Sequence, residues 1–351
     1  MRSFDYSTLK EKTWDHEIIS LIAQIHEYKG RQEVYLKQKP EELNKLVEIA
    51  KRQSTEASNA IEGIRTTNAR LKELCEEKTT PKNRDEEEIL GYRDVLNTIH
   101  ENYEYIPIKT NYILQLHRDL YKYTEKSIGG HFKISQNEIA AIDRNGKEYI
   151  LFTPLAPYET APAMDAICES YNKMIENDEL DAILLIPIFI HDFLCIHPFS
   201  DGNGRMSRLL TALLLYRSGY VIGKYISIES KIANNKDLYY KALEDCQSGW
   251  YENDEDVTPF VKYMLRIILA AYRDFEERVE LVSEKLPSKE IVRRAIYSKM
   301  GKLSKSDISE LCPSIGVKSV ELALKQLVDE GVLEKKGLGR ATFYIRKDIN
   351  L

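Results

Sequence analysis

The sequence lacks the features that mark secreted, membrane-spanning or zinc-binding chains. Its five cysteines are scattered and include no Cys-x-x-Cys pair, a pattern typical of free thiols in a reducing compartment. The first residues carry charges throughout, without the apolar segment of a signal peptide. The longest apolar run, at 182–190, is far shorter than a membrane span. We therefore expect a cytoplasmic protein with no membrane partner.

An excess of positive charge is also missing from the chain as a whole. The net charge of -6 at pH 7 opposes non-specific binding to the phosphate backbone of nucleic acid. The apolar content of 43% and charged content of 30% are ordinary for a soluble globular protein. With 351 residues, and no internal repeat or low-complexity tract, we expect two or three domains.

Helical periodicity dominates the first two thirds of the chain. Apolar residues from Leu43 to Ile61 recur at three- and four-residue spacing, which predicts a helix over 40–63 that stops at Gly63. Pro162 is expected in the first turn of its helix, and Pro187 is expected to kink the helix that contains it. Further helices are predicted at 67–77, 85–103, 111–123, 162–177, 180–195, 204–218, 235–245 and 259–284.

Two regions depart from this helical pattern. Asn145-Gly146 lies between short mixed runs and predicts a β-hairpin over 138–152. Residues 288–351 hold 13 basic and 8 acidic side chains and read as helices at 289–299, 304–311 and 319–330, with a turn at Pro313 and Gly316. Strand-like runs follow, separated by Gly337 and Gly339, an order typical of a winged helix. The predicted fold class is mainly α, with a β-hairpin and a small C-terminal winged-helix domain.

The segment HPFSDGNGRMSR has the chemistry of a phosphate site at the start of a helix. Gly202 and Gly204 let the backbone present N–H groups to an anion, and the helix that follows adds its positive end. Arg205 and Arg208 are three residues apart and share a face, where both guanidiniums can grip a polyphosphate. Asp201 is an oxygen ligand of the kind that Mg²⁺ prefers. A histidine upstream, His197, can take a proton at neutral pH. This set favours phosphoryl or nucleotidyl transfer.

The same segment resembles the signature of the Fic (filamentation induced by cAMP) family, His-Pro-Phe-x-Asp/Glu-Gly-Asn-Gly-Arg-x-x-Arg. The fixed positions are filled by His197, Pro198, Phe199, Asp201, Gly202, Asn203, Gly204, Arg205 and Arg208. The resemblance implies a Fic-type helical bundle that uses ATP and Mg²⁺ to transfer AMP to Ser, Thr or Tyr hydroxyls of a target protein.

The resemblance also implies a role for each position of the signature. His197 would be the base and Asp201 the metal ligand. The α-phosphate would lie against Gly202, Asn203 and Gly204, and the β- and γ-phosphates against Arg205 and Arg208. Glycine at position 204 favours AMP transfer over a kinase reaction.

A second segment, 58–63, resembles the inhibitory motif of the family, Ser/Thr-x-x-x-Glu-Gly/Asn. Ser58, Glu62 and Gly63 match it, and Ser58 and Glu62 are four apart on one helix face. By this resemblance Glu62 pairs with Arg208 and takes the place of the γ-phosphate. That ion pair must break before ATP can bind productively.

The resemblance extends more loosely to the rest of the site. The hairpin corresponds to the flap that holds a stretch of the target protein by strand addition. Its usual start is Gly-x-Tyr/Phe-Arg, and this chain has Lys133 at the arginine position, which leaves that contact open. The segment 237–247 resembles the helix that lines the adenine pocket, with Tyr240, Leu243 and Gln247 as candidate contacts or, alternatively, core residues. His191 is interpreted as a satisfied core histidine.

We divide the chain into an N-terminal helical region, 1–105, a Fic core, 106–285, and a winged helix, 286–351. The winged helix could contact nucleic acid through basic side chains, although a protein-contact or structural role is favoured. The candidates are Lys318, Lys325, Lys335, Lys336 and Arg340. Two other functions stay open: a nucleotide-sensing winged-helix DNA-binding regulator, and a hydrolase in which Glu62 positions water to remove AMP. A homodimer is possible, because relatives often pair.

Overall fold

The computed structural model describes residues 2–38, 40–125, 128–142, 148–283, 287–297, 299, 301–312 and 315–347. They group into two compact units. The first unit combines Met1–Glu27 with Ala50–Ala271, and the second combines Tyr28–Ile49 with Tyr272–Leu351. The division of the chain into three domains at 105 and 285 stays a prediction.

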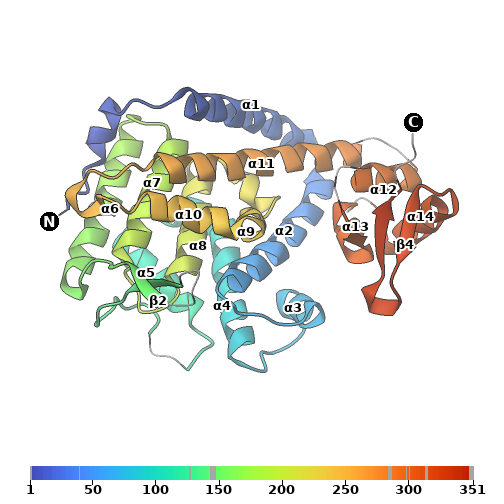
Figure 1. Ribbon diagram of the computed structural model, residues 1–351, viewed down its shortest axis with the longest axis horizontal. Helices are drawn as coiled ribbons and strands as arrows, with labels where there is room; N and C mark the ends of the chain where they lie inside the picture. Colours follow the sequence, from blue (N-terminus) through green and yellow to red (C-terminus); the bar gives the residue numbers. More distant parts are fainter. Residues whose placement is uncertain are drawn as a thin grey trace. The chain divides into compact units, whose positions relative to one another are not determined.

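Helices account for most of the described chain (Figure 1). The α-helices are α1 His16–Gln38, α2 Pro40–Ile61, α3 Asn68–Cys75, α4 Arg84–Asn102, α5 Thr110–Leu120, α6 Pro157–Glu176, α7 Ala182–Ile196, α8 Asn203–Arg217, α9 Ile228–Asn234, α10 Lys236–Asp245, α11 Thr258–Ser283, α12 Ser288–Tyr297, α13 Lys305–Leu311 and α14 Val317–Asp329. Short 3₁₀ helices lie at Tyr6–Glu11, Tyr103–Tyr105, Val221–Lys224, Trp250–Glu252 and Gly339–Ala341. The strands are β1 Ile139–Ile142, β2 Glu148–Phe152, β3 Leu303–Ser304, β4 Leu333–Lys336 and β5 Phe343–Arg346.

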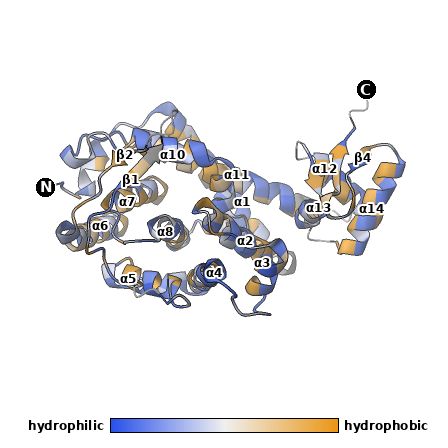
Figure 2. Cartoon of the chain, turned by 60° about the horizontal axis from the view of Figure 1, so that its bottom comes forward, coloured by the Kyte–Doolittle hydropathy of each residue, from blue (hydrophilic) through white to orange (hydrophobic). Residues whose placement is uncertain are grey.

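The core of the first unit is built around α7 and α8. Every residue of α7 from Ile183 to Phe193 is buried, as expected of a helix that is apolar on all sides. α8 packs against α7 and α4, and Figure 2 shows it nearly end-on, with α4, α5, α6 and α7 around it. The loop between α7 and α8 is therefore held by two helices that cannot shift without disturbing this core. Within the described residues, the helices are too short or too polar to cross a membrane.

Most predicted helices are confirmed, with ends displaced by a few residues, but three features differ. Helices α1 and α9 were not predicted. The prediction that Pro162 opens its helix is wrong, because α6 begins at Pro157, where the Glu159 carboxylate receives the Ala156 N–H at 3.3 Å. Pro162 lies inside α6, and Pro187 lies inside α7, where the expected kink stays a prediction.

The predicted hairpin is present as β1 and β2, which pair antiparallel with Ala140 opposite Ile150. The register shifts between Ile139 and Ala140. The proposed turn at Asn145-Gly146 lies outside the described residues. A two-stranded ribbon is marginal in water by itself, so its connections to the helical body, described below, matter for its stability.

The second unit contains α12, α13 and α14 with an antiparallel sheet in the order β3-β5-β4. Its core is formed by apolar side chains of these helices, among them Val292, Ile308 and Leu324. The elements follow the predicted order, and the assignment to the winged-helix class stays a prediction. Pro313 and the Arg340 side chain lie outside what the structure describes.

Several basic side chains of this unit are already paired with carboxylates. The ion pairs are Lys289–Glu330 at 2.7 Å, Lys305–Glu321 at 2.7 Å and Lys336–Glu334 at 3.4 Å. Paired charges of this kind present a mixed surface rather than a basic stripe. Whether this unit contacts protein or nucleic acid stays a prediction.

Candidate active site

The loop between α7 and α8 is closed by its own side chains. His197 follows α7 in the left-handed conformation (φ 51°, ψ 62°), and Gly202 turns the chain with a φ of 83° just before α8. The buried Asn203 side chain receives the Phe199 N–H at 2.9 Å and donates to the Phe199 carbonyl at 2.7 Å. The Asn203 amide therefore braces the loop, and its contribution to anion binding would come from the main-chain N–H at the start of α8.

His197 is held as a neutral base. Its Nδ1 lies 3.3 Å from the Leu194 carbonyl, which can only accept a hydrogen bond. Nδ1 therefore carries the proton and Nε2 keeps its lone pair. Burial lowers the pKa of His197 to about 4, and the nearby Lys133 ammonium acts in the same direction. At neutral pH the imidazole is ready to accept a proton at Nε2.

A second histidine, His117 of α5, braces the same loop although no motif marks it. The Gly130 N–H donates to His117 Nδ1 at 3.0 Å, so His117 Nε2 carries the proton and donates to the Asp201 carbonyl at 3.0 Å. The ring stacks on Phe199 with centroids 3.7 Å apart and planes at 5°. Burial lowers the pKa of His117 to about 4, which keeps the bridge in this neutral form.

Lys133 joins the segment before the β1–β2 hairpin to the end of α7. Its N–H donates to the Pro198 carbonyl at 2.9 Å, and its Nζ donates to the Ile196 carbonyl at 3.0 Å and to Asn137 Oδ1 at 2.9 Å. Lys133 thus places a buried ammonium on the last carbonyl of a helix, where positive charge is favourable, and whether this replaces the arginine contact of the family stays open. Burial lowers the pKa of Lys133 to about 8.

The candidate metal ligand Asp201 presents its carboxylate at the surface of the loop. Its Oδ1 receives the Gly202 N–H at 2.7 Å, and its side chain is 41% exposed. Among the described residues, no group of three or more His, Cys, Asp or Glu side chains is arranged to hold a metal ion. Asp201 by itself suits Mg²⁺, which keeps several waters and shares its other ligands with substrate phosphates.

Arg208 connects α8 to the end of α2. Its Nε donates to Ser58 Oγ at 2.7 Å, and its Nη2 donates to the Ser58 carbonyl at 2.9 Å and to Glu62 Oε1 at 2.7 Å. The Arg208 side chain is 3% exposed. α2 ends at Ile61, and Gly63 takes a φ of 84°, as expected of a glycine that ends a helix. The predicted pairing of Glu62 with Arg208 is therefore present.

The Glu62 carboxylate rests on the bare backbone of Gly204. A Cβ atom at position 204 would lie 2.3 Å from Glu62 Oε1 and 3.3 Å from Arg208 Nη1. Glu62 therefore fills the space that the missing side chain of Gly204 leaves at the helix start. An oxygen of a bound phosphate would suit the same position, because both groups are anionic acceptors near a guanidinium and a helix N-terminus.

Arg205 lies deeper than the sequence implies. Its side chain is 1% exposed, and its Nη2 pairs with Glu88 Oε2 at 2.7 Å and donates to Tyr121 Oη at 2.7 Å. Its Nε and Nη1 are buried without a hydrogen-bond partner in the described part of the chain. Buried donors normally have a partner. Arg205 thus fits an anion that supplies one, and Glu88, which the sequence did not single out, orients it.

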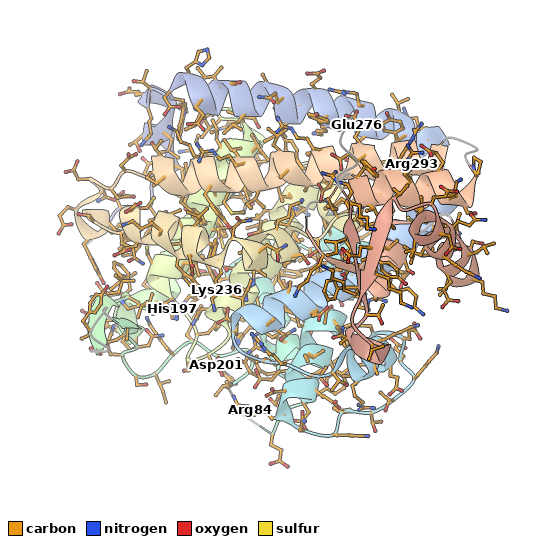
Figure 3. The ribbon with its side chains drawn as sticks, turned by 45° about the vertical axis from the view of Figure 1, so that its right-hand side comes forward. Arg84, His197, Asp201, Lys236, Glu276 and Arg293 are labelled. Carbon is orange, nitrogen blue, oxygen red and sulfur yellow. The ribbon has the colours of Figure 1, made fainter. Side chains whose placement is uncertain are left out.

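These groups meet around a cavity of about 490 Å³. It is lined by Glu62, Gly63, Ile64, Arg84, Asp85, Glu88, His197, Ser200, Asp201, Gly202, Asn203, Gly204 and Arg205. Figure 3 shows the labelled Arg84, His197 and Asp201 near one another at one end of the first unit. Glycine backbone, an orphaned guanidinium and an exposed carboxylate together fit a nucleotide polyphosphate with Mg²⁺.

The three candidate adenine contacts are not among the residues that line this cavity. Tyr240 is 43% exposed, and Lys236 Nζ lies 5.5 Å from the centre of its ring. Leu243 is buried, and Gln247 follows the end of α10. Gln247 Oε1 is buried and lacks a hydrogen-bond partner in the described chain. Their role at the adenine base stays a prediction.

Fold and site together define a helical protein in which an arginine-lined cavity opens at the N-terminus of a central helix. Residues 107–215 match the family model of the Fic/DOC family. The crystal structure of a Fic family protein from Desulfovibrio desulfuricans superposes with a TM-score of 0.62 at 21% identity, covering 97% of this chain and 98% of that one. A Fic domain containing signaling protein from Bacteroides thetaiotaomicron gives a TM-score of 0.60 at 25% identity, covering 75% and 97%. The chain therefore contains a Fic/DOC family domain at residues 107–215.

Curated relatives match part of the chain. A Fido domain-containing protein of Dictyostelium discoideum is 27% identical over 127 residues, 36% of this chain and 84% of that protein. The protein adenylyltransferase Fic of Drosophila yakuba is 29% identical over 214 residues, 59% of this chain and 38% of that protein. The chain therefore spans less than half the length of the curated adenylyltransferase.

Proposed function

We propose that this protein transfers AMP from ATP to a hydroxyl group of a protein, and that Glu62 holds the resting enzyme inactive. The observation that carries the proposal is the neutral His197, which faces the same cavity as Asp201, Gly204 and Arg205. The names of the adenylyltransferase relatives support the same reaction.

His197 acts as the general base of the transfer. Its Nε2 takes the proton of the target hydroxyl while the hydroxyl oxygen bonds to the α-phosphorus, and the bond between that phosphorus and pyrophosphate breaks. The Leu194 carbonyl holds the Nδ1 proton of the same ring and so stabilises the imidazolium that forms. Mg²⁺, held by Asp201, would supply positive charge to the phosphates.

The polyphosphate lies along the start of α8 in this proposal. The first N–H groups of the helix have no intrahelical partner and point toward an anion. Arg205 Nε and Nη1 supply two further donors. For the adenine base, the exposed ring of Tyr240 offers a stacking surface, and Gln247 Oε1 offers an acceptor. The target protein would add a strand to the hairpin of β1 and β2.

Glu62 inhibits by occupying the place of a phosphate. The carboxylate sits on Gly204 and accepts a hydrogen bond from Arg208, so a nucleotide whose phosphate needs that space must displace it. Arg208 is buried and already bonded to Ser58. Breaking its pair with Glu62 leaves an unpaired buried charge until a phosphate arrives, which makes displacement costly.

We expect Glu62→Gly to raise protein labelling from α-labelled ATP and Mg²⁺ at least about tenfold, a change of about 1.4 kcal/mol. His197→Ala in the Glu62→Gly background should remove the label, because no base then accepts the hydroxyl proton. Mass spectrometry of labelled lysate proteins should show the added AMP on Ser, Thr or Tyr.

A matched control is Glu77→Gly. Glu77 also follows a helix end, and its φ of 57° suits glycine, but it does not line the cavity. This variant should label like the wild type. Equal labelling by wild type and Glu62→Gly would contradict the inhibitory role, and label that persists in the double variant would contradict the role of His197.

A further inference from the structure

The cavity has a third arginine that differs from the two in the signature. Arg205 and Arg208 are 1% and 3% exposed and are tied to Glu88, Ser58 and Glu62 inside the resting protein. Arg84, the first residue of α4, also lines the cavity, but its side chain is 59% exposed. Of these three arginines, Arg84 can change its direction without disturbing the core.

Arg84 lies between two acidic groups of the cavity. Its Nε donates to Glu88 Oε1 at 2.7 Å, and its Nη2 is 3.8 Å from Asp201 Oδ2. Glu88 receives Arg205 on its other oxygen, Oε2, at 2.7 Å. One buried carboxylate thus holds two guanidiniums on the same wall of the cavity. The Asp201 carboxylate faces both guanidiniums from the loop, 3.8 Å from Arg84 Nη2 and 4.0 Å from Arg205 Nη2.

The strengths of these contacts determine which arginine can respond to a ligand. The Arg205–Glu88 pair is buried on both sides, and breaking it would leave unpaired charges in the interior. The outer pair of Arg84 with Glu88 joins a guanidinium that is 59% exposed to a carboxylate that is 3% exposed, and water around the guanidinium lowers the contribution of this pair toward the value of about 0–1 kcal/mol for surface pairs. A phosphate chain offers Arg84 bidentate, charge-assisted hydrogen bonds that exceed this value.

We propose that Arg84 is a substrate-binding residue that grips the β- and γ-phosphates of ATP beside Asp201. This inference rests on the proposed function, since it assigns a residue to the same nucleotide. In the transfer step, the P–O bond breaks toward pyrophosphate, and Arg84 pairs with the negative charge that pyrophosphate gains. AMP lacks these two phosphates and makes no contact with Arg84.

The test is calorimetric binding of ATP and of AMP, each with Mg²⁺, to Glu62→Gly and to the same protein carrying Arg84→Ala, Arg84→Gln or Arg84→Lys. A lost pair of charge-assisted hydrogen bonds corresponds to about a tenfold to hundredfold rise in Kd. We expect this rise for ATP with the alanine and glutamine variants. For AMP we expect less than a twofold change, and for lysine a partial recovery of ATP binding.

The control is Arg266→Ala in the same background. Arg266 is 60% exposed and pairs with Glu17 on the first unit, away from the lining residues of the cavity. It should leave both affinities unchanged. Equal ATP affinities in the Arg84 variants and the Glu62→Gly parent would overturn the role of Arg84 and leave the proposed function standing. An equal loss for ATP and AMP would overturn the assignment to the β- and γ-phosphates. Absence of ATP binding to Glu62→Gly itself would overturn the proposed function, and the Arg84 inference with it.

Discussion

At the scale of single residues, the environment of His197 sets the pH range of the proposed chemistry. Burial disfavours the charged imidazolium, and Lys133 opposes it further, while the Leu194 carbonyl and Glu62 favour it. The balance places the pKa of His197 at about 4. A base with a lowered pKa is neutral, and therefore active, over a wider range on the acid side.

We predict that AMP transfer by Glu62→Gly at saturating Mg²⁺ and ATP keeps more than half of its rate at pH 5.5. An imidazole with an ordinary pKa near 6.5 would have lost about nine tenths of its neutral form there. Removing Glu62 removes one influence that raises the pKa, so the acid limb should not move upward. The measurement is the initial rate of labelling between pH 5 and 8. A half-loss centred near pH 6.5 would contradict the assignment.

The sequence predicts some residues of the site and misses others for a physical reason. His197, Asp201, Arg205 and Arg208 form one local motif, because they lie on one loop and the first turns of one helix. Ser58 and Glu62 were found through their resemblance to the inhibitory motif of the Fic family, and their four-residue spacing places them on one helix face. Glu88, Arg84 and His117 carry no local pattern, since each reaches the site across the bundle from α4 or α5.

At the scale of elements, close approach of helices limits substitution at Gly91 of α4. A Cβ atom there would lie 1.9 Å from the Leu120 carbonyl oxygen at the end of α5. Because the obstacle is backbone, a side-chain rotation cannot relieve it. This contact fixes the spacing of the two helices that carry Arg84 and His117.

We predict that Gly91→Ala destabilises the protein by about 1–3 kcal/mol, the usual cost of overpacking. Urea unfolding followed by circular dichroism measures the change. The control is Gly30→Ala in α1, where a Cβ would meet nothing within 4 Å. There alanine should stabilise by up to about 1 kcal/mol, since it is the better helix former. Similar shifts in both variants would contradict the close approach of α4 and α5.

Helix prediction also succeeded and failed for identifiable reasons. α7 and α8 are apolar over long runs, so their positions follow from the sequence. In α1 the buried Ile18, Leu21 and Ile25 do recur at helical spacing, and this signal could have revealed the helix. The prediction placed Pro162 in the first turn because proline usually disrupts a helix interior. Inside α6, Pro162 leaves the Tyr158 carbonyl without its helical hydrogen bond, and Tyr158 is 80% exposed, so this carbonyl can bond to water instead.

At the scale of the whole molecule, buried histidines make folding sensitive to acid. Burial lowers the pKa of His100 to about 3 and the pKa values of His117, His191 and His197 to about 4. His191 is buried as predicted, but its Nδ1 has no hydrogen-bond partner in the described chain, so the interpretation of a fully satisfied ring is wrong. A folded pKa below the unfolded value of 6.5 means that stability is full above pH 6.5 and is lost as the pH falls toward 4.

We predict a marked drop in melting temperature between pH 7.5 and pH 5. His100 alone should cost about 2 kcal/mol at pH 5, because the unfolded chain binds a proton that the buried ring refuses. The glutamine of His100→Gln cannot titrate, so the melting temperature of this variant should fall less between pH 7.5 and pH 5, by the amount that corresponds to about 2 kcal/mol. Exposed His16 provides the control, and His16→Gln should melt like the wild type at both pH values. Parallel drops in all three proteins would contradict the prediction.

The cavity of about 490 Å³ exists while the Glu62 carboxylate is in place. Glu62, the residue proposed to inhibit, thus lines the cavity and leaves the remaining volume accessible. A drug-like compound shaped to that volume could use the docked carboxylate as part of its own binding wall. Such a compound would bind the conformation in which the Glu62 carboxylate is docked. An ATP mimic would first have to displace that carboxylate.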